Sequence, residues 1–302
     1  MKIGINSGAA SGPETTVDGL IARAQMMENL GFDCFWMANM FGLDALTALA
    51  LVGQKTTRIK LGTAVVPSYP RHPLVMAQQA ATTNATSAGR FTLGIGLSHK
   101  PIIEGMFGMS FDKPAKHMRE YLQILGPALH NEKIDYSGEQ YKARGQIAVA
   151  ESESVPLVVA ALGDTMLKLA GTYADGTITW MTGPKTLEEH IIPKIRKAAE
   201  IAGRPEPRIV AGIPTAIVSD KEAAITRIDK GMKMYGKLDS YKAMLKREGT
   251  DVPSGIAFIG DENELRKKIQ RLRDIGVTDL NCAILGVGDH DTTAQFLASE
   301  LT

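Results

Sequence analysis

Short runs of β-branched and other apolar residues alternate with longer segments of helical periodicity along the whole chain. This alternation is typical of a parallel sheet whose strands are connected by helices. Eight apolar runs predict strands, at residues 2–6, 33–38, 59–66, 91–97, 156–162, 176–181, 208–217 and 278–285. Eight strands are the number that closes a (β/α)8 TIM barrel. We therefore predict a single α/β domain over residues 1–302.

The ends of the predicted helices support the strand count. Asp261 followed by Glu264 forms a capping-box pattern, and Gly276 suits the left-handed position after that helix. An open, doubly wound sheet is the alternative, but such sheets usually carry nucleotide-binding glycines in the first strand-to-helix turn. Here that turn, residues 6–10, contains one glycine. Pro214 lies inside the seventh run, so we expect that strand to end or bulge there, because proline removes a ladder hydrogen bond.

Three segments are additional to the strands and helices of a minimal barrel. Residues 101–113 extend the loop after the fourth strand, residues 132–150 resemble a hairpin, and residues 235–256 add a helix before the last strand. Loops that follow barrel strands build the active site in this fold. We therefore expect the first and third segments to line one mouth of the barrel.

Composition narrows the functional classes. Hydrophobic residues make up 44% of the chain, and 34 Lys and Arg residues balance 33 Asp and Glu residues. Without a basic excess we expect no nucleic-acid partner. No apolar stretch approaches the roughly 20 residues that span a bilayer, and no signal peptide precedes the first strand, so we expect a cytoplasmic protein without membrane contact. Cys34 and Cys282 lack metal-ligand spacing and are predicted to be buried thiols.

Common catalytic motifs are missing from the sequence. Residues 94–99 begin like a dinucleotide fingerprint, but His99 replaces the third glycine and the motif closes a strand. The sequence contains no P-loop, nucleophile elbow, HExxH pair or paired-cysteine zinc pattern. Hydrolase and metalloenzyme functions therefore have little support, and no metal is expected.

Several segments together carry a family resemblance. They lie in the same order along nearly the whole chain, at residues 58–67, 71–80, 89–96, 160–163, 169–176 and 276–279. In this combination the chain resembles the bacterial luciferase-like superfamily of flavin and deazaflavin enzymes. Residues 96–101 and the Met-rich loop after them look most like the coenzyme F420-dependent oxidoreductase branch. The resemblance implies a luciferase-like TIM barrel with insertions that uses coenzyme F420, with FMN as the alternative cofactor.

The two cofactors imply different reactions. A deazaflavin is an obligate hydride carrier, whereas reduced FMN activates dioxygen. The resemblance thus favours hydride transfer between coenzyme F420 and a small, apolar or aromatic organic substrate. The alternatives are an FMN-dependent monooxygenase and a flavin-binding protein without turnover.

The resemblance also assigns cofactor-binding positions. The ring should contact Ala38 and Asn39 and rest on Ala64 and Val65, joined by a cis peptide bond. The phosphate should meet backbone amides in two strand-to-helix turns, since such turns present unpaired N–H groups to an anion. These amides belong to Leu97, Ser98, His99, Leu162 and Gly163, and Ala161 before the second turn is a further cofactor-binding position.

His99 and Asn39 are the catalytic candidates. Sugar-phosphate dehydrogenases of the superfamily carry an Asp-His pair after the second strand and a Glu after the fourth; the matching residues here look like Ala38, Asn39 and His99. This difference argues against glucose 6-phosphate as the substrate. An ordinary His titrates near pH 6.5, so His99 can donate a proton. The alternative is that His99 only binds the cofactor and solvent, for example water on Asn39, supplies the proton.

Apolar side chains near strand ends are the substrate candidates, because adaptable Met and aromatic residues suit an apolar ligand. They are Met40, Phe41, Met106, Phe107, Trp180 and Met181. The resemblance further implies a homodimer formed through the helices after the second and third strands. Small and apolar residues there could supply the contact: Ala45, Leu46, Ala48, Leu49, Met76, Ala77 and Ala80.

Overall fold

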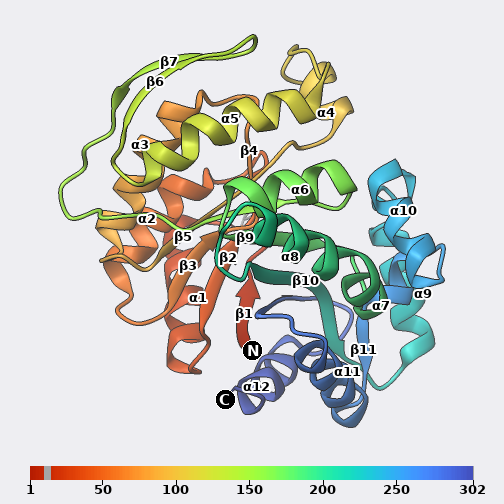
Figure 1. Cartoon of the computed structure of the whole chain (residues 1–302). Coiled ribbons are helices and arrows are strands. Elements are labelled where there is room, and N and C mark those ends of the chain that lie inside the picture. The colour runs from red at the N-terminus through yellow and green to blue at the C-terminus, as the bar shows by residue number, and fades with distance from the viewer. Residues whose placement is uncertain (10–14, 302) are drawn as a thin grey trace.

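Eight parallel strands form a closed barrel in the computed structural model, which describes residues 1–9 and 15–301 (Figure 1). Closure follows from the pairing of β10 with both β9 and β12. Around the ring the strands are β1 (Lys2–Asn6), β2 (Cys34–Met37), β3 (Lys60–Thr63), β5 (Phe91–Gly96), β8 (Leu157–Ala160), β9 (Gly176–Trp180), β10 (Arg208–Ile217) and β12 (Asp279–Ile284). The predicted barrel is therefore confirmed. The predicted first turn, residues 6–10, lies partly outside the described residues.

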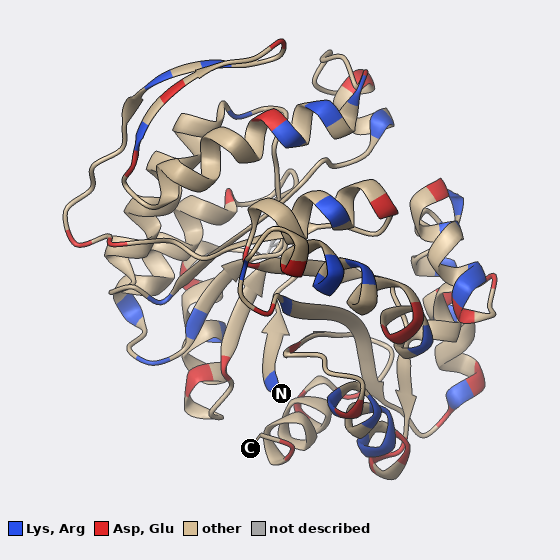
Figure 2. Cartoon of the chain, in the orientation of Figure 1, with Lys and Arg blue, Asp and Glu red and all other residues tan. Residues whose placement is uncertain are grey.

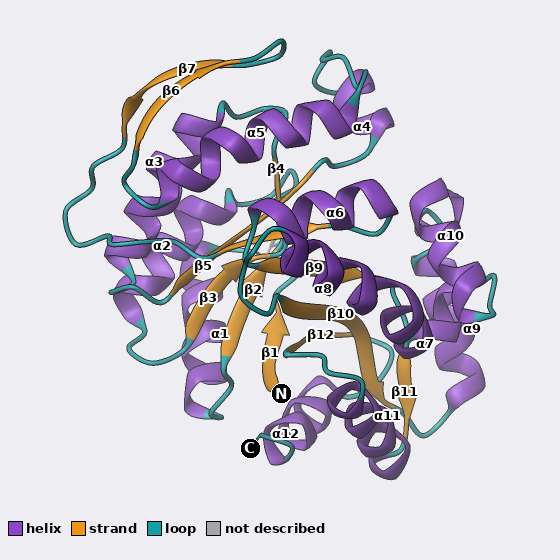
Figure 3. Cartoon of the chain, viewed as in Figure 1, coloured by secondary structure: helices purple, strands orange, loops and turns teal. Residues whose placement is uncertain are grey.

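Two strands depart from the predicted boundaries. The third predicted run is split: β3 is followed by the short β4 (Val66–Pro67), with the predicted cis peptide bond between Ala64 and Val65 at the interruption. A strand that was not predicted, β11 (Phe258–Gly260), pairs with the end of β10. Figure 3 shows β10 curving out of the barrel to reach it.

The expectation that β10 ends or bulges at Pro214 is wrong. The strand continues because Pro214 lies at a position where no neighbouring strand requires a hydrogen bond from its backbone nitrogen. Pairing with β9 ends at Gly212, and pairing with β11 begins at Thr215. The carbonyl of Thr215 accepts from Leu285 N on the β12 side, so the neighbouring Pro214 faces the side between β9 and β11.

Helices cover the outside of the barrel, and the main core lies between them and the outward faces of the strands. The described helices are α1 (Val17–Asn29), α2 (Ala45–Lys55), α3 (Pro73–Thr86), α4 (Lys100–Gly105), α5 (Pro114–Leu129), α6 (Asp164–Tyr173), α7 (Pro184–Thr186), α8 (Ile192–Ile201), α9 (Lys221–Gly231), α10 (Asp239–Glu248), α11 (Glu262–Asp274) and α12 (His290–Ser299). The predicted capping box of Asp261 and Glu264 begins α11. Basic and acidic residues are interspersed on the helices (Figure 2), as the near-zero net charge implies. None of the described helices is long and apolar enough to cross a membrane.

Trp36 is the largest side chain of the cluster that fills the barrel interior, which also contains Cys34, Val158, Ile178 and Val210. The Trp36 indole is fully buried and packs where Gly62 leaves room. A Cβ atom on Gly62 would lie 2.3 Å from Cζ3 of Trp36. At the amino-terminal end, Arg208 and Asp279 form an ion pair of 2.8 Å that closes the interior with polar groups. The barrel is therefore a packed core up to the level of Trp36.

The residues proposed for a dimer contact are buried within the chain. Those of α2 and α3 named above pack in the chain's own core, so their side chains are not available to a partner. Leu51 and Val75 are the exposed apolar residues of these two helices. Homodimer formation stays a prediction. Cys34 and Cys282 are free and buried, as predicted.

The hairpin predicted at 132–150 is confirmed as β6 (Lys133–Ser137) and β7 (Lys142–Gln146), which arch over α5 (Figure 1). The Glu120 carboxylate of α5 accepts hydrogen bonds from three backbone N–H groups at the hairpin turn. His117 of α5 joins the same contact: Nε2 lies 2.8 Å from Ser68 Oγ and Nδ1 lies 3.2 Å from Tyr141 OH. Burial lowers the pKa of His117 to about 4, although Glu120 opposes the shift. A neutral imidazole thus connects α5, the hairpin and the segment after β4.

The packing of Trp36 predicts a stability change. Gly62→Ala should lower the free energy of unfolding by about 1–3 kcal/mol, because the new methyl group overlaps a ring that the closed barrel cannot move aside. Gly105→Ala is the matched control, since a Cβ atom there meets no atom within 4 Å. Urea unfolding of both variants measures the difference, and equal stability would contradict this account of the barrel interior.

His117 predicts a pH dependence of stability. Its pKa is lower in the folded state than the ordinary 6.5, so its contribution is complete above pH 6.5 and is lost as the pH falls toward 4. The loss should amount to about 3 kcal/mol. In His117→Gln, unfolding free energies should fall less steeply over this range than in wild type. His130→Gln, which removes a histidine of exposed position, should keep the wild-type slope.

Candidate active site

The predicted site residues lie together at the carboxyl-terminal ends of the barrel strands. Ala38 and Asn39 follow β2, Ala64 and Val65 follow β3, residues 97–99 follow β5, and residues 161–163 follow β8. Trp180 ends β9. Parallel strands bring these ends to one rim, which is where active sites of this fold are built. We call this rim the mouth.

Small side chains form the floor of the mouth above Trp36. Ala64, Val65 and Ala160 are partly buried and pack on the interior cluster that contains Trp36. Gly96 lies beneath two of them: a Cβ atom there would be 2.8 Å from Val65 Cγ2 and 3.1 Å from Ala160 Cβ. These side chains are small and only partly buried, so the floor offers an apolar surface to a ligand.

Asn39 has a structural role, and its side-chain NH2 group is a free hydrogen-bond donor. Its side-chain oxygen accepts from Ala45 N at 2.9 Å, at the start of α2, and its backbone N–H donates to Val65 O at 3.2 Å. These bonds hold the loop after β2 against the segment after β3. The side-chain NH2 group has no hydrogen-bond partner among the described residues. Asn39 can therefore donate hydrogen bonds to a ligand or to water.

His99 differs from the other histidines of the chain. It occupies the N-cap position of α4 without a side-chain cap, and neither ring nitrogen has a partner in the described part of the chain. The other five histidines each have a ring nitrogen in a hydrogen bond: His72, His117, His130, His190 and His290. Burial lowers the pKa of His99. Its imidazole is thus available for ligand binding or proton transfer and is mainly neutral at pH 7.

Two turns at the mouth present backbone N–H groups. Ser98 has φ +61°, and neither its N–H nor that of His99 donates to another described residue. At the other turn, Gly163 caps α6, and a Cβ atom there would meet nothing within 4 Å. His190 Nε2 lies 2.8 Å from Leu162 O and fixes this turn. The Asp164 carboxylate disfavours an anion at the helix end, but Lys194 neutralises it at 2.5 Å and lowers its pKa.

The predicted substrate residues fall into two groups. Met40, Phe41, Met106 and Phe107 are exposed on the loops after β2 and β5, and the rings of Phe41 and Phe107 are 6.0 Å apart. Trp180 is partly buried at the end of β9. Met181 is completely buried. Ala161 is also buried, and its side chain belongs to the core outside the barrel. Met181 therefore supports the mouth from behind, and Ala161 can contact a ligand only through its backbone.

Sequence reasoning missed two tyrosines of the mouth. Tyr235 and Tyr241 come from the 235–256 segment, and the Tyr241 ring lies 5.8 Å from that of His99. This contact confirms the expectation that the 235–256 segment reaches the mouth, where it meets His99. The sequence did contain a signal for these residues, namely two tyrosines six positions apart in a segment already expected to line the mouth.

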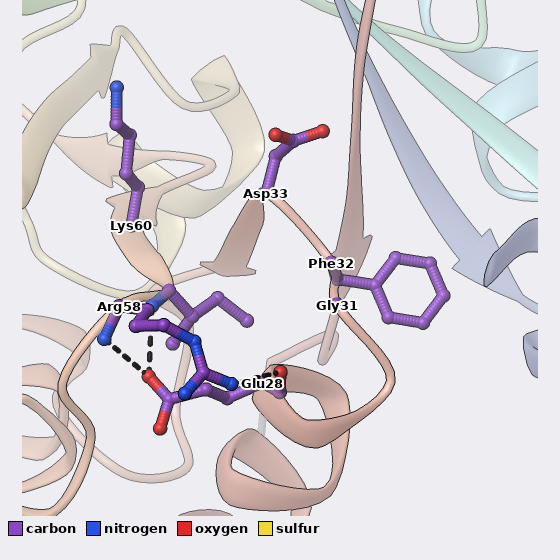
Figure 4. A pocket seen from close by; sticks show the side chains of 7 residues that line it. Glu28, Gly31, Phe32, Asp33, Arg58 and Lys60 are labelled. Carbon is purple, nitrogen blue, oxygen red and sulfur yellow. Dashed lines mark hydrogen bonds between the residues drawn. The ribbon is translucent and has the colours of Figure 1, made fainter. Parts of the chain in front are cut away.

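A separate hollow of about 220 Å³ lies at the opposite end of the barrel (Figure 4). It is formed before β2 and β3 by residues that include Glu28, Asp33 and Lys60. Burial opposes ionisation of Glu28, but hydrogen bonds from the N–H groups of residues 57–59 outweigh it and lower the pKa. Because its carboxylate holds the β3 entry in place, we assign this hollow a structural role.

Comparisons with known proteins identify the family and agree with the fold. The luciferase-like monooxygenase family model matches residues 1–292. The chain is 26% identical over 297 residues to 5,10-methylenetetrahydromethanopterin reductase of Methanolobus tindarius, covering 89% of this chain and 90% of that protein. The coenzyme F420-dependent tetrahydromethanopterin reductase of Methanopyrus kandleri is 25% identical, with a TM-score of 0.80 and coverage of 99% and 98%.

Proteins that are not reductases also share this fold. The oxygenating constituent of 3,6-diketocamphane monooxygenase from Pseudomonas putida, in complex with FMN, has a TM-score of 0.79 at 16% identity, covering 100% of this chain and 97% of that one. The barrel alone therefore does not distinguish the two cofactors. Since the family model spans nearly the full length, the chain belongs to the luciferase-like monooxygenase family of oxidoreductase enzymes.

Proposed function

We propose that the chain is a coenzyme F420-dependent oxidoreductase acting on a small apolar or aromatic substrate. The proposal rests mainly on His99. Its imidazole is partly buried, both of its ring nitrogens are free of partners, and it belongs to the same mouth as the floor of small residues. Full-length similarity to a coenzyme F420-dependent tetrahydromethanopterin reductase favours the deazaflavin over FMN.

The described residues fit such a cofactor. The floor of Ala64, Val65 and Ala160 offers an apolar surface to a planar ring, and the Asn39 NH2 group can donate to a ring oxygen. The open space at Gly163 and the free amides of Ser98 and His99 suit a phosphate. When bound, the reduced coenzyme supplies a hydride to the substrate.

His99 would supply the accompanying proton. Because burial lowers its pKa, the protonated fraction at neutral pH is small, and the rate should depend on how much imidazolium is present. The alternative is that His99 binds the cofactor while water held by Asn39 delivers the proton. The exposed Met and Phe residues around the mouth would exclude water from the bound substrate.

The cofactor assignment predicts a binding preference. Titration with oxidised coenzyme F420 should give a saturable spectral change, while FMN should bind at least about tenfold more weakly. Reduced coenzyme F420 should be oxidised without oxygen when a substrate is present. Tight FMN binding with oxygen-dependent turnover would instead identify a monooxygenase, and cofactor binding without turnover would identify a flavin-binding protein.

A substitution separates the two roles of His99. If it donates the proton, His99→Gln should leave cofactor affinity near wild type and slow single-turnover oxidation of the reduced cofactor by about 10²- to 10⁴-fold. His130→Gln, which alters a histidine away from the mouth, should leave both unchanged. Loss of cofactor affinity with an unchanged rate at saturation would show that His99 is a binding residue.

The same role predicts a pH profile. An acid with a lowered pKa is protonated only at low pH, so the single-turnover rate should fall as the pH rises, with a midpoint below the ordinary 6.5 of histidine. The measurement is the rate between pH 5 and pH 8 at saturating cofactor. A profile that stays flat in wild type, or that persists in His99→Gln, would assign the proton to another donor.

A further inference from the structure

Four rings from separate parts of the chain form a continuous side of the mouth. His99 lies 5.8 Å from Tyr241, Tyr241 lies 5.3 Å from Tyr235 at 90°, and Tyr235 lies 6.1 Å from Trp180, all measured between ring centroids. They come from the loop after β5, from α10, from the short helix Tyr235–Lys237 and from the end of β9. We call these four residues the aromatic wall.

The wall is held in place by contacts of α10 with the barrel. The Glu248 carboxylate accepts hydrogen bonds from Lys185 N and from both the N–H and the hydroxyl of Thr186, at the start of α7. Leu245 of α10 packs with Met181 in a buried cluster, on which Trp180, Tyr235 and Tyr241 also pack. The rings are therefore supported from behind by a fixed helix.

Tyr241 carries the unused polar group of this wall. Burial raises the pKa of its phenol, with Tyr235 adding to the shift, so the hydroxyl stays protonated at neutral pH. The hydroxyl has no hydrogen-bond partner among the described residues, yet it is not one of the sealed, unpartnered polar atoms of the interior. The hydroxyl is therefore a donor without a partner in the described part of the chain, and it is not completely sealed from the mouth.

We propose that Tyr241 determines substrate specificity by selecting a planar conjugated molecule with a hydrogen-bond acceptor. The ring of the substrate would pack on the aromatic wall, and its carbonyl oxygen or imine nitrogen would accept from the Tyr241 hydroxyl. The His99 and Tyr241 rings are neighbours, with centroids 5.8 Å apart, and in this proposal both side chains would bind the same acceptor atom. This inference rests on the proposed function, in which that atom belongs to the bond being reduced.

Two amides that differ in one group test the proposal. trans-Cinnamamide and crotonamide share a conjugated amide, but the first carries a phenyl ring where the second carries a methyl group. Isothermal titration calorimetry, with and without saturating oxidised coenzyme F420, gives their dissociation constants. Wild type should bind cinnamamide at least about tenfold more tightly than crotonamide.

Two variants separate the ring from the hydroxyl. Tyr241→Leu should abolish the preference for cinnamamide, whereas Tyr241→Phe should keep it but weaken binding of both amides by about two- to tenfold. Tyr136→Phe is the matched control: it removes a hydroxyl that binds Gln123 at the hairpin and should change neither constant. Thermal unfolding of each variant confirms that it is folded.

The outcomes distinguish this inference from the proposed function. Equal binding of the two amides by wild type, or an undiminished preference in folded Tyr241→Leu, would overturn the role of Tyr241. Wild type that prefers cinnamamide but does not bind coenzyme F420 would overturn the proposed cofactor while supporting the aromatic wall.

Discussion

Closure of the sheet, in which β10 pairs with both β9 and β12, is the constraint on which the rest of the structure depends. A closed parallel barrel has no free edge, so its strands pair their backbone groups on both sides and are fixed in register. Fixed register brings the ends of β2, β3, β5, β8 and β9 to one rim. Residues far apart in the chain, such as Asn39 and Gly163, thereby become parts of the same mouth.

Side chains at different levels of the barrel interior have different roles: those below the mouth stabilise the barrel, and those at the mouth form the surface that a ligand contacts. At the amino-terminal end, the Arg208–Asp279 pair closes the interior, and Trp36 fills the space above it. The small residues Ala64, Val65 and Ala160 pack on this column at the level of the mouth. The same column that stabilises the barrel therefore supports the floor of the mouth.

The histidines show how structural and chemical roles are separated. His117 and His190 have hydrogen-bond partners that fix loops, and burial lowers the pKa of each, so both are mainly neutral at pH 7. His99 is also partly buried but lacks such partners, which leaves its nitrogens for a ligand. The nearby Tyr241 is likewise held by packing of its ring and keeps its hydroxyl free. The 235–256 insertion thus adds a second side chain with a free polar group to the mouth.

The sequence by itself determined the eight-strand barrel, the capped helices and the positions that follow each strand, because these depend on local periodicity and end signals. The family resemblance of the sequence also pointed to His99, Ala64 and Val65, whereas Ala160 was recognised as part of the floor only in the structure. Tertiary structure alone decided that β10 passes through Pro214, since this depends on where β9 ends and β11 begins. It alone decided that Met181 is buried and that Tyr241 meets His99, because both depend on how an inserted helix packs against a distant strand.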